Sequence, residues 1–223
     1  HNIDALIGQE FFYGNLWNVS ASSGNMPMEG LWEVSSGSIM TGTNSYEDND
    51  RMLSFFSKAD YNYKQKYYIS ASLRADGSSR FNPDYRWGKF WSVGGAWRLS
   101  EESFIKSVTW IDLLKVKANY GTTGNNRVGL YEYLSAFQTG VNDFDNPGVA
   151  LSRLPNDILS WETNTQTDVG LEFGLFKRLS GSFDYFIKDS KDLLFSVDLP
   201  LSTGFPNITS NVGDVRNKGY ELE

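Results

Sequence analysis

The stretch Tyr67–Asp76, which reads YYISASLRAD, decides the fold. Along it, apolar residues such as Ile69 and Leu73 alternate with polar residues such as Ser72 and Arg74. Successive side chains of a β-strand point to opposite faces of the sheet. The stretch therefore predicts a strand with one apolar face and one polar face.

The same alternation recurs on both sides of this stretch and predicts an all-β chain. Aromatic residues make up 15% of the sequence, as is typical of strands, and glycine and asparagine cluster between the apolar runs. We predict strands over 2–10, 51–63, 67–76, 87–99, 113–121, 161–175, 179–189 and 212–223. Tight turns at 64–66 and 176–178 alternate with long polar connections at 12–50, 77–86, 122–160 and 190–211.

Strand and loop lengths favour a transmembrane β-barrel, with a soluble β-sandwich as the alternative. Membrane barrels have strands of about 9–11 residues, tight periplasmic turns and long external loops, whereas most soluble strands span about 5–6 residues. Aromatic residues at the strand ends are expected to form two interfacial girdles. The girdles would contain Tyr61, Tyr63, Tyr67 and Phe176 at the tight turns, and Trp87, Tyr120 and Trp161 at the long-loop ends.

Composition excludes several kinds of function. Twenty basic and 27 acidic residues give a net charge of −7, which argues against nucleic-acid binding. Without cysteine, and with His1 as the single histidine, the chain lacks disulfides, thiolate zinc sites and histidine-based triads. We expect no enzyme activity and no cofactor. The acidic runs 48–50 and 142–146 could supply calcium ligands, but neither has EF-hand spacing, so solvated loops are favoured.

Two glutamates also invite a catalytic interpretation, which a structural one outweighs. Glu101 and Glu102 follow Ser100 in the connection between two predicted strands. Serine is a favoured N-cap residue, and acidic residues stabilise the positive end of a helix. We therefore predict a single helical turn capped by Ser100, and no acid–base pair.

The cost of burying charge in lipid assigns a direction to each face. An arginine or lysine that faces lipid at mid-depth costs about 2–4 kcal/mol, so the charged face should line the barrel interior. Lys89 lies on the apolar side near the outer end of its strand, where its ammonium can extend to the interface. The predicted lumen-facing polar residues are Arg74, Asp76, Arg98, Lys115, Lys117, Asp168 and Glu172.

Several longer runs resemble one family, the SusC/RagA-type TonB-dependent transporters of Bacteroidetes outer membranes. The similar runs are RADGSSRF (74–81), RWGKFWSVGGAWRLSEESFI (86–105), LKVKANYGTTGNN (114–126), LSWETNTQTDVGLEFGLF (159–176), KDLLFSVDLPLSTGF (191–205) and NVGDVRNKGYELE (211–223). They cover roughly 51–223 in the family's order, and 1–50 is similar more loosely, through HNIDALIGQE.

This resemblance implies a bacterial outer-membrane protein with a 22-stranded antiparallel barrel, an internal plug and a TonB-binding segment. Such transporters pair with a SusD-like lipoprotein that closes over the barrel, and they import oligosaccharides or peptides. We expect residues 1–223 to be a piece of the barrel wall, about eight strands, without the plug and the TonB-binding segment. The alternatives are a soluble carbohydrate-binding sandwich module and a non-transporting barrel or adhesin.

The resemblance also gives the polar and aromatic residues two possible kinds of role. For most lumen-facing residues, contact with the plug or with structural water is favoured over contact with substrate. Aromatic residues of the long connections could stack on substrate or pack against the lipoprotein lid, although packing among themselves in local cores is the favoured interpretation. These residues are Trp17, Trp32, Tyr46, Tyr131, Tyr133 and Phe144.

Overall fold

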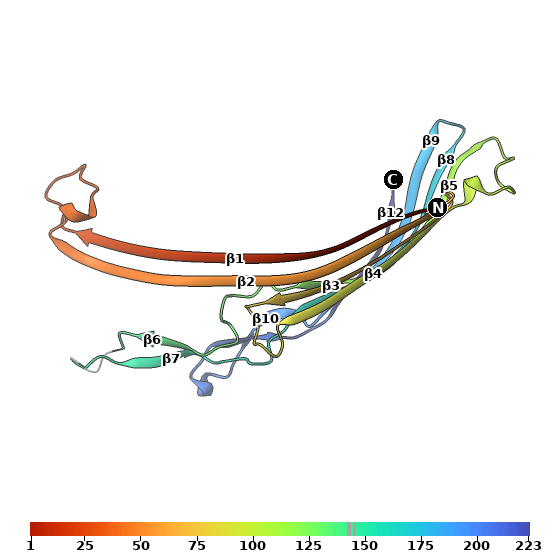
Figure 1. The fold of residues 1–223 in the computed structure, drawn as a ribbon. Coiled ribbons are helices and arrows are strands. Elements are labelled where there is room, and N and C mark those ends of the chain that lie inside the picture. Colours follow the sequence, from red (N-terminus) through yellow and green to blue (C-terminus); the bar gives the residue numbers. More distant parts are fainter. Residues whose placement is uncertain (142–143, 145) are drawn as a thin grey trace.

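The computed structural model describes residues 1–141, 144 and 146–223. Within them, eight long strands form one antiparallel sheet in which each strand pairs with the next (Figure 1). The strands, in sheet order, are β1 (Asn2–Gly24), β2 (Ile39–Tyr63), β3 (Tyr67–Ser78), β4 (Trp87–Arg98), β5 (Ile111–Asn125), β8 (Glu162–Leu175), β9 (Leu179–Lys191) and β12 (Val215–Leu222). No described helix has the length and apolar character needed to cross a membrane.

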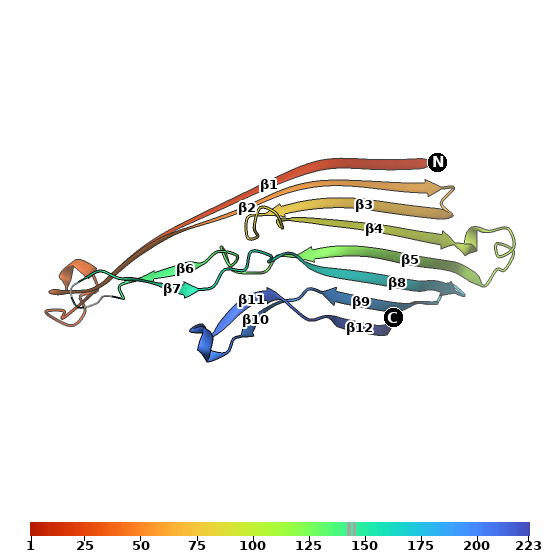
Figure 2. The same ribbon diagram turned by 90° about the horizontal axis from the view of Figure 1, so that it is seen from below.

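Two small hairpins and three single turns of 3₁₀-helix complete the described secondary structure. The hairpins, β6 (Ala136–Thr139) with β7 (Val149–Arg153) and β10 (Leu194–Asp198) with β11 (Asn207–Asn211), belong to the long connections (Figure 2). The turns are η1 (Val34–Ser36), η2 (Leu99–Glu101) and η3 (Leu201–Thr203). The long connections are therefore folded.

The register places the side chains on two faces of the sheet, an outward face and a lumen face. On the outward face, Leu73 of β3 lies opposite Trp91 of β4 and Ala71 lies opposite Val93, and the face continues on β5 at Val116, opposite Trp97. The lumen face carries the side chains at the intervening positions. Leu73 is 63% exposed and Val116 is 36% exposed, so no described part of the chain covers the outward apolar face.

This exposure decides between the two predicted architectures. The sheet is a single curved layer in Figure 1, and no second sheet packs on its outward face in the described residues. A soluble sandwich would bury that face in its core. The sandwich alternative is therefore wrong, and the antiparallel barrel-wall prediction is confirmed.

The largest difference from the predicted strands lies in the connection 12–50. β1 and β2 stay paired from Asn2 opposite Asn62 to Gly24 opposite Ile39, so most of this stretch is strand and not loop. β2 pairs with β3 only from Met52 to Tyr63. Between Ile39 and Met52 it pairs with β1 alone, and this two-stranded ribbon is about 40 Å long at 3.3 Å per residue (Figure 1). Apolar alternation fades there because neither face meets lipid or a core.

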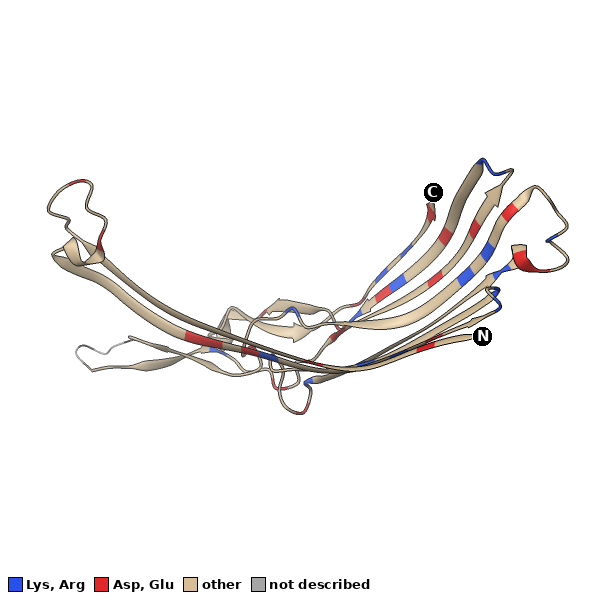
Figure 3. Cartoon of the chain, turned by 45° about the horizontal axis from the view of Figure 1, so that its top comes forward, with Lys and Arg blue, Asp and Glu red and all other residues tan. Residues whose placement is uncertain are grey.

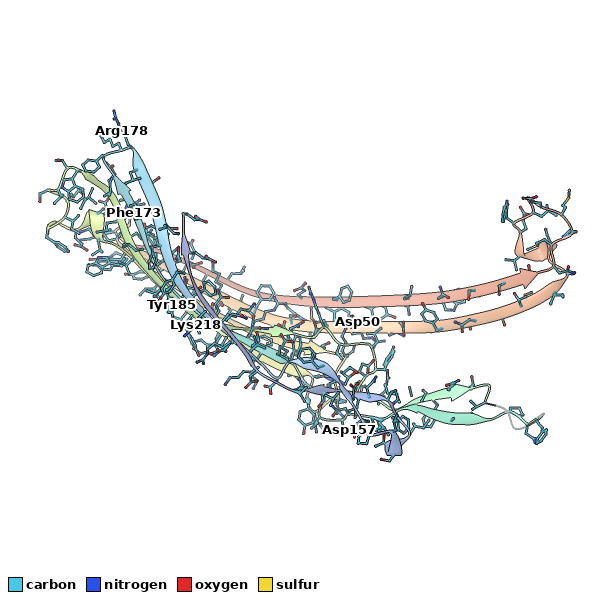
Figure 4. All side chains as sticks on the ribbon, turned by 180° about the vertical axis from the view of Figure 1, so that it is seen from behind. Asp50, Asp157, Phe173, Arg178, Tyr185 and Lys218 are labelled. Atoms are coloured by element: carbon cyan, nitrogen blue, oxygen red, sulfur yellow. The ribbon has the colours of Figure 1, made fainter. Side chains whose placement is uncertain are left out.

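The tight turns are confirmed, and the predicted serine cap is wrong. Three residues, 64–66, join β2 to β3; Lys64 and Gln65 have left-handed φ angles of 53° and 57°, and the Lys66 N–H donates to the Tyr63 carbonyl, which closes a tight turn. Arg178, at the turn between β8 and β9, lies at the far end of the sheet from the long hairpin (Figure 4). Ser100 lies inside η2, which follows Arg98 without a side-chain cap, because the turn begins two residues earlier than predicted.

The aromatic girdles are present with one correction. At the tight-turn end, Tyr67 stacks on Trp97 and Trp110 stacks on Phe176, with ring centroids 6.0 and 5.7 Å apart. At the other end, Trp91 contacts Tyr120 on the same outward face. Trp161 was predicted to join this outer girdle, but it is only 8% exposed and belongs to a buried cluster among the loops.

Candidate functional site: the polar lining and the folded outer loops

Antiparallel pairing brings the predicted lining residues onto one face from different strands. Lys115 lies opposite Glu172, and Asn119 opposite Asp168, so β5 and β8 present their charges side by side. On β3, Arg74 and Asp76 share this lumen face with Phe90 of β4. On this face β5 carries Lys115 and Lys117 whereas β8 carries Asp168 and Glu172, and Figure 3 shows basic and acidic positions on neighbouring strands. The lining is thus a mixed-charge surface, in which six of the seven predicted lining residues form ion pairs.

Arg74 is the centre of the first charge cluster. Its Nε donates to both carboxylate oxygens of Asp76 at 2.7 and 2.9 Å, and a terminal nitrogen donates to Glu10 at 3.2 Å and to Ser54 at 3.1 Å. The guanidinium also lies 5.5 Å from the centre of the Phe56 ring. Asp76 is 6% exposed, so this pairing compensates a buried charge and ties together β1, β2 and β3.

The second cluster crosses three strands. Lys115 and Lys117 lie 3.2 and 3.6 Å from the Glu172 carboxylate, and Lys117 also reaches Asp184 on β9 at 2.9 Å. The Lys117–Asp184 pair passes over Gly170, where a Cβ atom would collide with both side chains. Glycine at this position therefore allows the ion pair to lie flat against the sheet.

The last two predicted lining residues have more local roles. Arg98 lies at the tight-turn end of β4 and pairs with Glu101 at 3.5 Å. Asp168 accepts a hydrogen bond from Gln166 of its own strand at 3.0 Å. Sequence reasoning missed Glu10 and Asp184, which complete the two clusters. The alternation places Asp184 on the polar side of its predicted strand. Its pairing with Lys117 depends on how β5, β8 and β9 align, which the sequence does not show.

A hollow on the lumen face lies beside the second cluster. Its volume is about 560 Å³, and its lining includes Lys58, Asp60, Tyr68, Lys115 and Lys117. Charged groups of both signs line the hollow, which suits it to contact with another polar surface or with water. No group of His, Asp or Glu side chains in the described residues has the arrangement needed to hold a metal ion.

The long connections fold into a platform around a small buried core. Phe81 and Leu159 are fully buried, and Trp161 lies 5.5 Å from both Phe81 and Phe90, measured between ring centroids. The Trp161 Nε1 donates to the Arg86 carbonyl at 2.8 Å. Loops from three parts of the sequence thus share one hydrophobic core at the long-loop end of the sheet.

Polar contacts reinforce this platform. Arg80 pairs with Asp50 of β2 at 2.7 Å and donates to the Val128 carbonyl at 2.6 Å. Arg153 of β7 pairs with Glu132 at 3.0 Å, and Glu132 also accepts from Thr209 of β11 at 3.2 Å. The two small hairpins are therefore tied to the same platform.

These contacts also show what the residues of one acidic run do in the fold. In 48–50, the Asp50 carboxylate is held by Arg80, and the Asn49 backbone is bonded to the Tyr131 hydroxyl. The run is structural. In the second run, 142–146, the residues Asn142, Asp143 and Asp145 lie outside the described residues.

The predicted loop aromatics separate into two groups. The Tyr131 hydroxyl accepts a hydrogen bond from the backbone N–H of Asn49 on β2 at 2.9 Å. Tyr133 packs against the buried core. These two follow the local-core interpretation. The other four are exposed, by 73% for Trp17, 84% for Trp32, 46% for Tyr46 and 95% for Phe144.

The comparison with protein families matches nearly the whole chain. The family described as TonB dependent receptor-like, beta-barrel, matches residues 2–223. This chain belongs to the TonB-dependent receptor β-barrel family. Its relatives include TonB-dependent receptor P39 of Formosa agariphila, 41% identical over 82% of this chain and 17% of the relative. TonB-dependent receptor SusC of Bacteroides thetaiotaomicron is 33% identical over 80% of this chain and 19% of SusC.

Solved structures agree with this assignment. A structure of the RagAB peptide importer in the closed-closed state matches with a TM-score of 0.92 and 32% identity, over 99% of this chain and 25% of that chain. The siderophore receptor PirA of Pseudomonas aeruginosa shares the fold at a TM-score of 0.54 and 15% identity, over 97% of this chain and 36% of PirA. The predicted SusC/RagA resemblance is confirmed, and with it the location of this barrel wall in the bacterial outer membrane.

The chain spans about a fifth of the length of the curated relatives it matches. The family consists of transporters and receptors, in agreement with the predicted class.

Proposed function

We propose that the whole protein imports a nutrient across the outer membrane in a TonB-dependent step, and that residues 1–223 form part of its barrel wall. The nutrient is an oligosaccharide or a peptide. One observation carries the proposal, namely that a single-layer sheet exposes an apolar outward face and an ion-paired lumen face. Likeness to SusC and to the RagAB peptide importer supports import over scaffolding.

In this proposal the lumen face contacts a plug domain and ordered water. The Arg74 and Lys117 clusters support this role, because their charges are already paired within the wall. The hollow beside Lys58 and Asp60 offers both signs of charge to an inserted polar surface. TonB would act on the plug from the periplasm, and the wall would remain fixed during transport.

The exposed aromatics Trp17, Trp32, Tyr46 and Phe144 are the proposed contacts for substrate or for a SusD-like lipoprotein lid. Aromatic rings supply large contact areas at low entropic cost, and they are enriched where proteins associate. The β1–β2 hairpin holds three of them beyond the end of β3, on the side of the long loops (Figure 1).

Uptake by living cells tests the proposed import. Cells that carry the full-length gene should accumulate a labelled oligosaccharide or peptide, and deletion of the gene or loss of TonB should stop this accumulation. Accumulation of a nutrient that is independent of TonB would contradict the proposal. Unchanged growth and uptake in the deletion strain on a panel of both nutrient classes would favour the adhesin alternative.

The aromatic contacts can be tested separately in the full-length protein. We expect Trp17→Ala with Trp32→Ala to reduce co-purification of the lipoprotein or binding of substrate while the barrel stays folded. Tyr133→Ala should instead loosen the loop platform, because this side chain packs on the buried core. If the double tryptophan variant retained both lipoprotein and substrate at normal levels, these residues would lose their proposed role.

A further inference from the structure

Two positively charged side chains, Arg51 and Lys89, lie near the long-loop end of the outward face, among the aromatic and aliphatic side chains of β1 to β4. Register places Lys89 of β4 opposite Ala75, between the outward residues Trp87 and Trp91. It also places Arg51 of β2 opposite Tyr13, and the Arg51 guanidinium lies 5.1 Å from the centre of the Tyr13 ring. Charge on a lipid-facing surface is costly, so its presence needs a physical reason.

These two charges differ from those of the lining. Arg74, Lys115 and Lys117 each have a carboxylate partner within 3.2 Å. In the part of the chain that the structure describes, neither the Arg51 guanidinium nor the Lys89 ammonium has an ion-pair partner. Both are therefore available to an anion from outside the protein.

A groove lies next to Lys89 on the same face. Its volume is about 550 Å³, and its lining includes Ile7, Phe55, Leu73, Ala75, Lys89 and Trp91. The groove follows β3, whose outward residues become small toward the long-loop end, at Ala75 and Gly77. Phe55 of β2 and Trp87 of β4 stack across this stretch with ring centroids 6.3 Å apart. The groove is thus an apolar channel with a positive charge in its wall.

The depth of the groove in the membrane indicates which part of a lipid can bind in it. Lys89 lies about 26 Å along β4 from the tight-turn girdle residue Trp97, at 3.3 Å per residue. Barrel strands tilt by about 35–45°, and the apolar band is about 25 Å tall. Lys89 therefore lies near the outer edge of the band, and Arg51 lies further out, at headgroup level.

From this arrangement we infer a binding site for an outer-leaflet lipid with a phosphorylated headgroup. Lys89 contacts a phosphate at the groove, Arg51 contacts the headgroup further out along β2, and an acyl chain lies in the groove over Ala75 toward Leu73. Charge complementarity selects a phosphate, since arginine and lysine are the usual phosphate-binding side chains. The apolar channel selects a lipid over free phosphate. This site is independent of import, so either proposal can fail without the other.

Native mass spectrometry of the full-length protein tests the site, with lipid A as the probe. We expect the wild-type protein to retain lipid A, and Arg51→Gln with Lys89→Gln to reduce retention at least tenfold. Lys218→Gln is the matched control, because Lys218 (labelled in Figure 4) also carries an outward charge, opposite Ile187 of β9, but does not line the groove. It should retain lipid A at the wild-type level.

Further measurements distinguish binding of a lipid from binding of free phosphate, and loss of the charges from loss of the fold. Inorganic phosphate in excess should not displace lipid A, and dephosphorylated lipid A should be retained as weakly as by the double variant. Ala75→Leu fills the groove without changing charge and should also reduce retention. Heat-modifiable gel mobility reports whether each barrel is folded. The inference would be overturned if the folded Ala75→Leu variant and the folded double variant both retained lipid A at the wild-type level. It would also be overturned if Lys218→Gln lost as much lipid A as the double variant.

Discussion

Val169 and Gln166, on the same strand, are under opposite physical constraints. Val169 is 47% exposed on the outward face, whereas Gln166 donates to Asp168 on the lumen face. Alternation predicted these directions from the sequence, as it did for Arg74 and Lys117. It could not identify their partners, Glu10 and Asp184, because these pairings depend on how strands distant in the sequence align.

A matched pair of substitutions on β8 tests the two faces. Val169→Arg places a charge in lipid and should destabilise the full-length barrel by about 2–4 kcal/mol. Gln166→Arg places the same charge in the lumen next to the Asp168 carboxylate and should change stability little. Urea unfolding in lipid vesicles measures both. Equal loss of stability in the two variants would refute the assignment of the faces.

Glu102 is a second residue with a defined physical consequence, and it lies outside the membrane-spanning strands. Its carboxylate accepts from the Tyr67 hydroxyl at 2.7 Å, the Lys66 ammonium at 3.1 Å and the Trp97 indole at 3.2 Å. These hydrogen bonds, that of Tyr67 foremost, lower the pKa of Glu102 below its ordinary value of 4.5. The carboxylate therefore stabilises the fold above that pH, and this contribution is lost as the pH falls through the lowered pKa.

Unfolding of the full-length barrel across a pH series measures this effect. We expect Glu102→Gln to be less stable than wild type at pH 7, and the difference to shrink below about pH 4.5. Glu101→Gln should give a smaller difference, because its Lys106 partner is 67% exposed. A wild-type advantage over Glu102→Gln that persists unchanged at low pH would contradict this assignment.

At the scale of elements, the strand ends depart most from sequence expectation. The membrane-level strands were predicted well because lipid on one side and water on the other impose a period of two. Above the membrane this constraint disappears, so the extension of β1 and β2 carries polar residues on both faces. There, cross-strand bonds hold the pair, such as Asn15 to Glu47 at 2.7 Å. The buried loop core was likewise missed, because its residues come from separate connections.

The loop core gives a prediction at this scale. Leu159 is fully buried and its neighbour Ile158 is 66% exposed, which makes them a matched pair. Leu159→Ala should destabilise the loop platform by about 2–5 kcal/mol, and Ile158→Ala should have little effect. Limited proteolysis on intact cells measures loop opening, while outer-membrane levels report the barrel. If both variants were cleaved at the same rate as wild type, the loops would not depend on this core.

At the scale of the whole molecule, apolar and charged side chains are distributed in the opposite way to those of a soluble protein. Large apolar side chains cover the outward surface, and the buried apolar residues of the described chain are a small cluster among the loops. The ion pairs lie on the opposite face, where Figure 3 shows charges of both signs along β5, β8 and β9. Such an arrangement is stable only where lipid replaces water on one side of the sheet.

The most direct test of this account is the solvent that each face meets in the membrane. The sequence has no cysteine, so single spin labels can be introduced into the full-length protein once any cysteine elsewhere has been replaced. Outward labels would replace Leu73, Val116, Leu171 and Phe183, and lumen labels would replace Asn119 and Gln166. We expect outward labels to collide with lipid-dissolved oxygen and lumen labels with a water-soluble nickel chelate. Outward labels that meet the nickel chelate, or are shielded from both reagents inside a protein core, would contradict the account.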